Sequence, residues 1–93
     1  MNKTAMDAIL SQYKKKLAVI IADGGVKIPV NVNNGYLAKD IKTLTIGGTD
    51  FIQLSNVDPR TKNSYKYLIP IDCIQGVIYT DDDLADIDFM RIL

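Results

Sequence analysis

The spacing of apolar residues changes after Lys16, and this change limits the folds that the chain can adopt. Up to Leu17, apolar side chains recur every three or four residues, on one face of a helix: Met6, Ile9, Leu10, Tyr13 and Leu17. With Thr4 and Asp7 as a loose capping box, this spacing predicts a helix from about Ala5 to Lys16. Beyond Lys16, the run Leu17 to Ala22 is apolar on both faces, which is typical of a buried strand. Later runs alternate apolar and polar residues, with Ile52 and Leu54 on one face, which is typical of half-exposed β-strands. The chain is therefore predicted to be mainly β, with one N-terminal helix.

Turn signals divide the region after the helix into about five or six short strands. The predicted strands are Leu17 to Ala22, Val26 to Val32, Tyr36 to Ile46, Phe51 to Ser55, Tyr65 to Ile71 and Ile74 to Tyr79. The turns contain Asp23-Gly24-Gly25, Asn33-Asn34-Gly35 and Gly47-Gly48-Thr49-Asp50. Pro29 places its strand at an edge or at a bulge, and a parity shift predicts a bulge or bend between Tyr36 and Ile46. Strands this short predict a small, strongly bent antiparallel barrel.

Charge separates residues 80–93 from the rest of the chain. Residues 1–79 hold ten Lys and Arg and six Asp, a net charge of +4, whereas residues 80–93 hold five Asp and Arg91, a net charge of −4. Thr80 followed by Asp81, Asp82 and Asp83 is typical of a helix start. We therefore divide the chain into a body, residues 1–79, and an acidic amphipathic C-terminal tail, residues 80–93. The tail is predicted to be either a short docking helix or simply an acidic tail.

The residues that most catalytic and metal sites need are missing from the sequence. It has no His and one Cys, which excludes Ser-His-Asp and Cys-His constellations and every metal site with His ligands. Asp81 to Asp83 are consecutive on a helix start and do not converge on one point. Neither Gly24-Gly25 nor Gly47-Gly48 precedes a helix that could hold a phosphate. We therefore expect no enzyme, no cofactor and no bound metal.

Membrane insertion is not expected either. The longest uninterrupted apolar run, Leu17 to Ala22, has six residues, whereas a membrane-spanning helix needs about 20. Cys73 has no partner for an internal disulfide, and we interpret it as a buried thiol in a reducing compartment. A cytoplasmic protein is predicted.

Basic residues are spread over the body in a way that suits nucleic acid as a ligand. They include Lys14, Lys15, Lys16, Lys27, Lys39 and Lys42. Together with Phe51 and several Tyr they would suit phosphate contact and base stacking. The alternative is that these charges only solvate exposed faces of the fold.

Two segments of the body match the two sequence motifs of a known family. The first motif is a strand, an Asn-Gly type turn, a long bent strand and an apolar strand. It is similar either to Val30 to Gly35 followed by Ile41 to Leu54, or to a register that begins at Leu17 to Ala22. The second motif, two strands joined by a very short turn, is similar to Tyr67 to Tyr79. From about Ala5 to Tyr79 the chain thus resembles the Sm-like proteins, the family that includes bacterial Hfq, as a divergent member of phage type.

The resemblance implies a particular fold and assembly. The expected fold is an N-terminal helix followed by a strongly bent, five-stranded antiparallel SH3-like barrel. In the family, the last two strands pair edge to edge between subunits, which satisfies their unpaired backbone groups. The expected partner is therefore the chain itself, in a homo-oligomeric ring of about five to seven subunits.

The resemblance also implies a ligand. Sm-like proteins bind single-stranded RNA around the central pore, through the turn before the third strand and the turn between the last two. The residues of this chain that match those turns are Thr49, Asp50, Phe51, Ile71, Asp72 and Cys73. Phe51 stands where Hfq stacks a base on an aromatic ring, but Ile71 and Asp72 stand where Hfq has a Lys-His pair.

Two functions are therefore open. The first is single-stranded RNA binding in an RNA-chaperone-like role. The alternative is a homo-oligomeric structural or protein-interaction module, such as a phage or mobile-element adaptor, that binds no RNA. The departures from the family's pore residues and the acidic tail favour the alternative.

Overall fold

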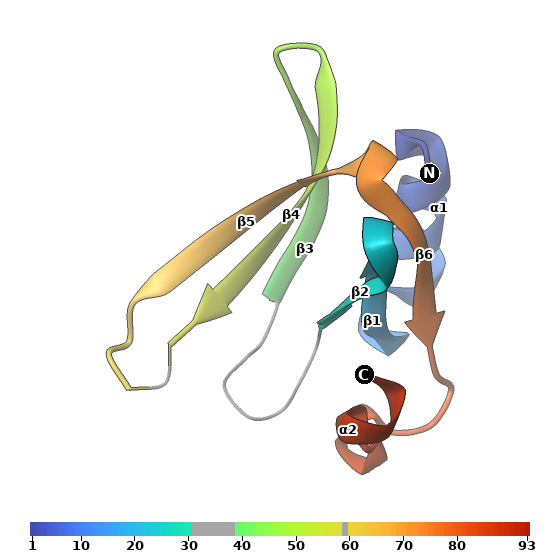
Figure 1. Ribbon diagram of the computed structural model, residues 1–93, viewed down its shortest axis with the longest axis vertical. Coiled ribbons are helices and arrows are strands. Elements are labelled where there is room, and N and C mark those ends of the chain that lie inside the picture. Colours follow the sequence, from blue (N-terminus) through green and yellow to red (C-terminus); the bar gives the residue numbers. More distant parts are fainter. Residues whose placement is uncertain (31–38, 59) are drawn as a thin grey trace.

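The computed structural model describes residues 1–30, 39–58 and 60–93, and contains one longer helix followed by short strands (Figure 1). The helices are α1 (Lys3–Tyr13) and α2 (Phe89–Ile92). The strands are β1 (Leu17–Ala22), β2 (Val26–Pro29), β3 (Lys39–Ile46), β4 (Thr49–Val57), β5 (Ser64–Pro70) and β6 (Ile74–Tyr79). Single 3₁₀ turns separate some of them: η1 (Lys14–Lys16), η2 (Asp23–Gly25), η3 (Ile71–Cys73) and η4 (Leu84–Asp86).

The strands form two antiparallel sheets of three strands each, in the orders β2-β1-β6 and β3-β4-β5. The prediction of a mainly β fold with an N-terminal helix is confirmed. The prediction of a five-stranded barrel is wrong in its count and in its closure, because the described residues form six strands and no closed barrel. β2 is an edge strand of the first sheet, as Pro29 predicted, and Pro29 is its last residue. The Val30 backbone N–H still donates to the Ala18 carbonyl, and the second sheet begins with β3 at Lys39.

The N-terminal helix begins two residues earlier than predicted. Asn2 is the N-cap, and its Oδ1 accepts a hydrogen bond from the Ala5 backbone N–H at 2.8 Å. Asp7, predicted to act in the cap, instead accepts a hydrogen bond from the Thr43 hydroxyl of β3. α1 is therefore held against the second sheet by a side-chain contact as well as by its apolar face.

The core lies between α1 and the two sheets. Its fully buried side chains are Met6, Leu17, Ile20, Val30, Ile41, Ile52, Leu54, Ile71 and Ile74. In β1 the four residues from Leu17 to Ile20 are all buried, which confirms the prediction of a strand covered on both faces. In β4 both Ile52 and Leu54 are buried, which confirms that these two share the inward face.

The β3–β4 hairpin turns on two glycines. Gly47 and Gly48 have φ of +57° and +80°, and Ile46 pairs with Thr49 across the turn. This left-handed geometry at both positions is that of a two-residue hairpin turn, for which glycine carries the smallest steric penalty. The predicted turn was longer, since Thr49 and Asp50 already belong to β4. The bulge predicted in the preceding strand is confirmed by a register shift between Lys39 and Lys42. The predicted turn Asn33-Asn34-Gly35 lies outside the described residues.

The C-terminal tail forms two short turns of helix rather than one helix that starts at Thr80. Asp83 Oδ1 accepts a hydrogen bond from the Ala85 backbone N–H and begins η4, and Asp88 Oδ1 accepts one from Met90 and precedes α2. The Thr80 hydroxyl accepts only from the Asp82 backbone N–H. Thr80 is therefore a turn residue, and the acids serve as separate local caps.

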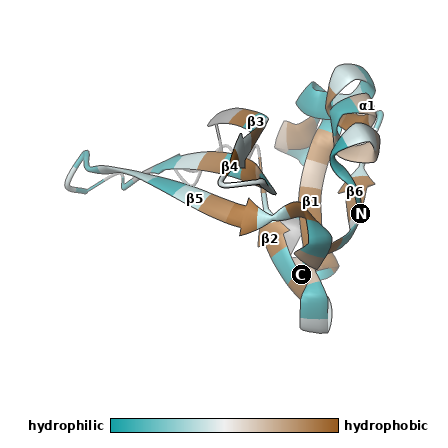
Figure 2. Ribbon diagram, turned by 90° about the horizontal axis from the view of Figure 1, so that it is seen from above, coloured by the Kyte–Doolittle hydropathy of each residue, from teal (hydrophilic) through white to brown (hydrophobic). Residues whose placement is uncertain are grey.

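The β4–β5 hairpin extends away from α1 and from the first sheet (Figure 1). Its far end is hydrophilic, whereas the part of β5 that approaches η3 is hydrophobic (Figure 2). Within the described part of the chain, no helix has the length and apolar character required to cross a membrane.

Candidate functional site

The two segments that match the family's RNA-binding turns lie next to each other in the structure. Phe51, the third residue of β4, pairs with Pro70, the last residue of β5. η3 follows Pro70 directly and carries Ile71, Asp72 and Cys73. The β4–β5 ladder thus brings Thr49, Asp50 and Phe51 to the same end of the sheet as η3.

Phe51 is half-buried and lies outside the core. It stands opposite Leu44 of β3 and Pro70 of β5. Because successive residues of a strand point to opposite faces, Phe51 lies on the face opposite to that of the buried Ile52. The aromatic ring is therefore placed on the sheet face that Gln53 and Ser55 also occupy.

The other candidate residues divide into buried, bonded and exposed groups. Ile71 is part of the core, so a ligand at η3 would meet its backbone or the neighbouring side chains. Asp50 Oδ1 accepts a hydrogen bond from the Thr45 hydroxyl at 2.7 Å. Thr49 and Asp72 are exposed, and Cys73 is a half-buried free thiol. The charges of this set, Asp50 and Asp72, are both negative, which disfavours phosphate at this end of the sheet.

A basic pocket lies further along the same sheet. It has a volume of about 340 Å³ and is lined by Lys14, Ile41, Lys42, Gln53, Ser55 and Lys66. Sequence reasoning identified Lys14 and Lys42 as dispersed charges and missed Gln53, Ser55 and Lys66. Gln53 and Ser55 could have been found from the alternation in β4, which places these polar residues on the face opposite to that of Ile52 and Leu54. The pairing of Ser55 with Lys66 depends on the strand register, which the sequence did not define.

An apolar groove lies between the two sheets, beside the edge strand β5. It has a volume of about 560 Å³ and is lined by Ile28, Pro29, Leu54, Ser55, Asn56, Lys66, Tyr67, Leu68 and Ile69. Tyr67 is 49% exposed and Leu68 is 45% exposed. Among the described strands, β5 pairs only with β4 and β6 pairs only with β1, so each has one edge without a partner strand.

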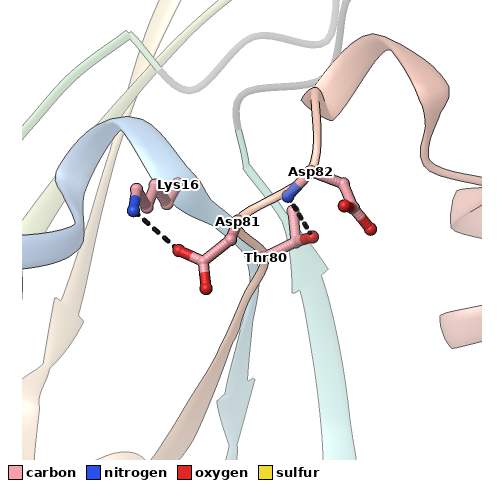
Figure 3. A network of polar contacts seen from close by, with 4 residues as sticks. All are labelled: Lys16, Thr80, Asp81 and Asp82. Carbon is pink, nitrogen blue, oxygen red and sulfur yellow. Dashed lines mark hydrogen bonds and ion pairs between the residues drawn. The ribbon is translucent and has the colours of Figure 1, made fainter.

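The tail contacts the body at the junction between η1 and β6. Lys16 Nζ donates a hydrogen bond to Asp81 Oδ1 at 2.7 Å, and the Asp82 backbone N–H donates to the Thr80 hydroxyl (Figure 3). The Asp81 carboxylate raises the pKa of Lys16 above its ordinary value, first through this hydrogen bond and then through its charge. Lys27 Nζ donates to the Ile92 carbonyl at 2.7 Å. The tail therefore occupies two lysines of the basic body.

Tyr79, the last residue of β6, lies beside this junction. Its ring stacks on that of Tyr13, with ring centroids 4.3 Å apart. Electrostatic repulsion between the two phenols when ionised raises the pKa of Tyr79 above its ordinary value. The stack ties the last strand of the body to the end of α1.

Comparison with protein-family models, with curated proteins and with solved structures finds no match for this chain. Among the residues that the structure describes, no three His, Cys, Asp or Glu side chains gather in a way that could hold a metal ion. The candidate sites of the described chain are therefore the segment pair around Phe51, the basic pocket, the apolar groove and the two strand edges.

Proposed function

We propose that the chain is an Sm-like protein that assembles into a homo-oligomeric ring in the cytoplasm and binds single-stranded RNA. The observation that carries the proposal is the position of the free edges of β5 and β6, two of the four edge strands in the described sheets. β5 and β6 are consecutive strands joined by η3 alone, yet they belong to different sheets. Each has one edge without a partner strand among the described residues.

Free edges of this kind favour pairing between copies. An unpaired strand edge presents backbone N–H and C=O groups that another chain can satisfy. If β5 of one copy pairs with β6 of the next, the two contact surfaces differ, and such head-to-tail contacts generate a ring when the rotation closes. Tyr67 and Leu68, exposed on β5, supply apolar surface for this contact. The ring explains how a short chain with a small core covers its edges.

The proposed RNA-binding surface includes Phe51, whose ring lies outside the core and is placed to stack a base. The second candidate function is a ring-forming structural or protein-interaction module, of phage or mobile-element origin, without RNA binding. The acidic residues Asp50 and Asp72 at the same end of the sheet favour this second candidate, because they repel phosphate.

The mass of the protein in solution tests the ring. Light scattering should give a mass several-fold above the 10.3 kDa of one chain. Leu68→Asp, on the free edge strand β5, should lower the mass toward that of one chain because it places a charge in the proposed seam. Ile46→Asp is the matched control, since Ile46 is 50% exposed beside the β3–β4 turn and away from the proposed seam. A monomeric mass for the unmodified protein at micromolar concentration rules the ring out.

A gel shift with short oligo-U and oligo-A at several salt concentrations separates the two candidate functions. Binding that weakens with salt supports the RNA function, and no binding to either strand supports the structural module. Phe51→Ala should weaken RNA binding by about 1–3 kcal/mol, the usual contribution of one stacked base. If Phe51→Ala lowers thermal stability and leaves RNA affinity unchanged, Phe51 is structural.

A further inference from the structure

The basic pocket is built by the register of the second sheet. Lys42 of β3 pairs with Gln53 of β4, and Ser55 of β4 pairs with Lys66 of β5. Gln53 and Ser55 are alternate residues and lie on one face of β4. The two lysines therefore flank two neutral polar side chains, one from each side of the central strand.

The spacing allows both lysines to reach one small ligand. Lys42 and Lys66 are separated by two strand spacings of about 4.8 Å and by two residues of about 3.4 Å, so their Cα atoms lie on the order of 12 Å apart. Two lysine side chains can converge from that separation on a point above Gln53 and Ser55. The buried Ile41 side chain lines the same pocket, and Lys14 of η1 completes its rim.

The electrostatics of the pocket favour an anion. The described residues of its lining include three lysines and no carboxylate. Within the described residues, neither Lys42 nor Lys66 has an ion pair or a side-chain hydrogen bond. Like charges that share a pocket repel each other, and a bound anion relieves that repulsion. Gln53 and Ser55 are half-buried, and their uncharged side chains can donate hydrogen bonds.

We propose that this pocket binds a phosphate group, with Lys42 and Lys66 balancing its charge and with Gln53 and Ser55 donating hydrogen bonds to its oxygens. Lysine serves as a compact point charge for phosphate, and neutral donors fix its orientation. The site lies outside the two segments around Phe51 and η3, so it is a second binding site on the molecule.

The position of the pocket also connects it with the proposed RNA function, on which this extension rests. Phe51 and Gln53 are alternate residues of β4, about 7 Å apart on the same face. A base stacked on Phe51 would therefore have its backbone close to the pocket. The phosphate group would then come from a nucleic acid strand, whereas free phosphate is the other source of the same chemistry.

A titration with inorganic phosphate tests the site directly. The amide resonances of Gln53 and Ser55 are followed by NMR, with sodium chloride at equal ionic strength as the reference. The double substitution Lys42→Ala/Lys66→Ala should weaken phosphate binding by about tenfold or more, which corresponds to about 1.4 kcal/mol. Lys3→Ala/Arg60→Ala removes the same charge outside the pocket and should leave the affinity unchanged.

Several outcomes overturn the inference. The pocket is not a phosphate site if the Gln53 and Ser55 resonances do not saturate with phosphate and oligonucleotide binding is indifferent to Lys42 and Lys66. It is also rejected if both double variants lose affinity equally, because the effect is then net charge alone. Lys42→Arg/Lys66→Arg keeps both charges and should retain binding. An amide spectrum of the alanine variant that matches that of the unmodified protein shows that its loss of binding is not misfolding.

The oligonucleotide arm identifies the source of the phosphate and separates the two proposals. If oligo-U binds and loses affinity in Lys42→Ala/Lys66→Ala but not in the control, the pocket holds a backbone phosphate. If phosphate saturates the pocket and no oligonucleotide binds, the pocket stands and the RNA function fails. If oligo-U binds with equal affinity to both double variants and phosphate does not saturate, the RNA function stands and the pocket fails.

Discussion

The two sheets differ in how completely the chain itself covers them. In the first sheet, the central strand β1 has four consecutive buried residues, from Leu17 to Ile20, so both its faces are packed. In the second sheet, the buried residues Ile52 and Leu54 of the central strand β4 alternate with the half-buried Phe51, Gln53 and Ser55. The other face of that sheet keeps large apolar side chains in solvent, including Ile46 and Leu68. The first sheet thus supplies stability, whereas the second presents surface for partners and ligands.

The largest expected effect is a difference in the loss of stability between one substitution in the first sheet and one in the second. Ile20→Ala should destabilise the fold by about 2–5 kcal/mol, because it opens a cavity in a strand buried on both faces. Ile46→Ala should change the free energy of unfolding by no more than about 0.5 kcal/mol, since Ile46 lies at a half-exposed position. Urea denaturation of both variants measures the difference. Equal losses would show that the two sheets are equally packed.

Replacing one glycine by alanine in each sheet compares the stability of the two sheets again. Gly48→Ala in the second sheet should cost about 1 kcal/mol, because alanine does not readily adopt the φ of +80° that the turn requires. Gly76→Ala in β6 of the first sheet should be neutral or stabilising by about 0.4–1 kcal/mol, since an added Cβ meets no atom within 4 Å and the unfolded chain loses freedom. Thermal denaturation of both variants tests this. A large loss of assembly in Gly76→Ala would instead place a neighbouring copy against β6.

The sequence predicts the first sheet better than the second. β1 and β6 have the predicted bounds, because runs with apolar residues on both faces are insensitive to register. Pro29 correctly predicted an edge strand, yet the division into two separate sheets in place of a barrel depends on hydrogen bonds between distant strands. In the tail, the helix start predicted at Thr80 is wrong, since Asp83 and Asp88 cap separate turns and tertiary contacts decide between these and one helix.

The candidate sites show the same limit. Phe51 was identified from a family motif, and its place on the outer face follows from the alternation around Ile52. The cross-strand partners of Gln53 and Ser55 could not be predicted from the sequence, because a shift of one residue in the β4–β5 register would place different side chains beside them. Composition indicated a basic body, but only strand pairing gathers Lys42 and Lys66 around one pocket.

Deletion of residues 81–93 should act on binding more than on assembly. The tail occupies Lys16 through Asp81 and Lys27 through the Ile92 carbonyl, and it carries a net charge of −4. Its removal keeps the hydrogen bond from the Thr80 backbone N–H to the Lys16 carbonyl. Affinity for an anionic polymer at low salt should therefore increase, and the gain should disappear at high salt.

One result of the deletion would contradict the shielding role of the tail. A gel shift at several salt concentrations and light scattering are measured on the same samples. A loss of assembly in the shortened chain would show that the tail is part of the subunit interface, and the shielding role would then be wrong.

The smallest expected effect is a loss of stability at alkaline pH at the junction of the tail and the first sheet. The pKa values of Lys16 and Tyr79 are both raised in the folded protein, above ordinary values of 10.5 and 10.0. A raised pKa means that the folded state holds its proton more tightly, so the contribution is complete below the ordinary value and is lost as pH rises through the raised one. Since Asp81 is the main cause for Lys16, Asp81→Asn should return the Lys16 pKa toward its ordinary value. Asp82→Asn is the matched control, because it removes the same charge one residue away from the ion pair. An NMR titration of the Lys16 side chain checks this, and equal pKa values for Lys16 in the two variants would show that the general charge of the tail, and not the Asp81 contact, holds the proton.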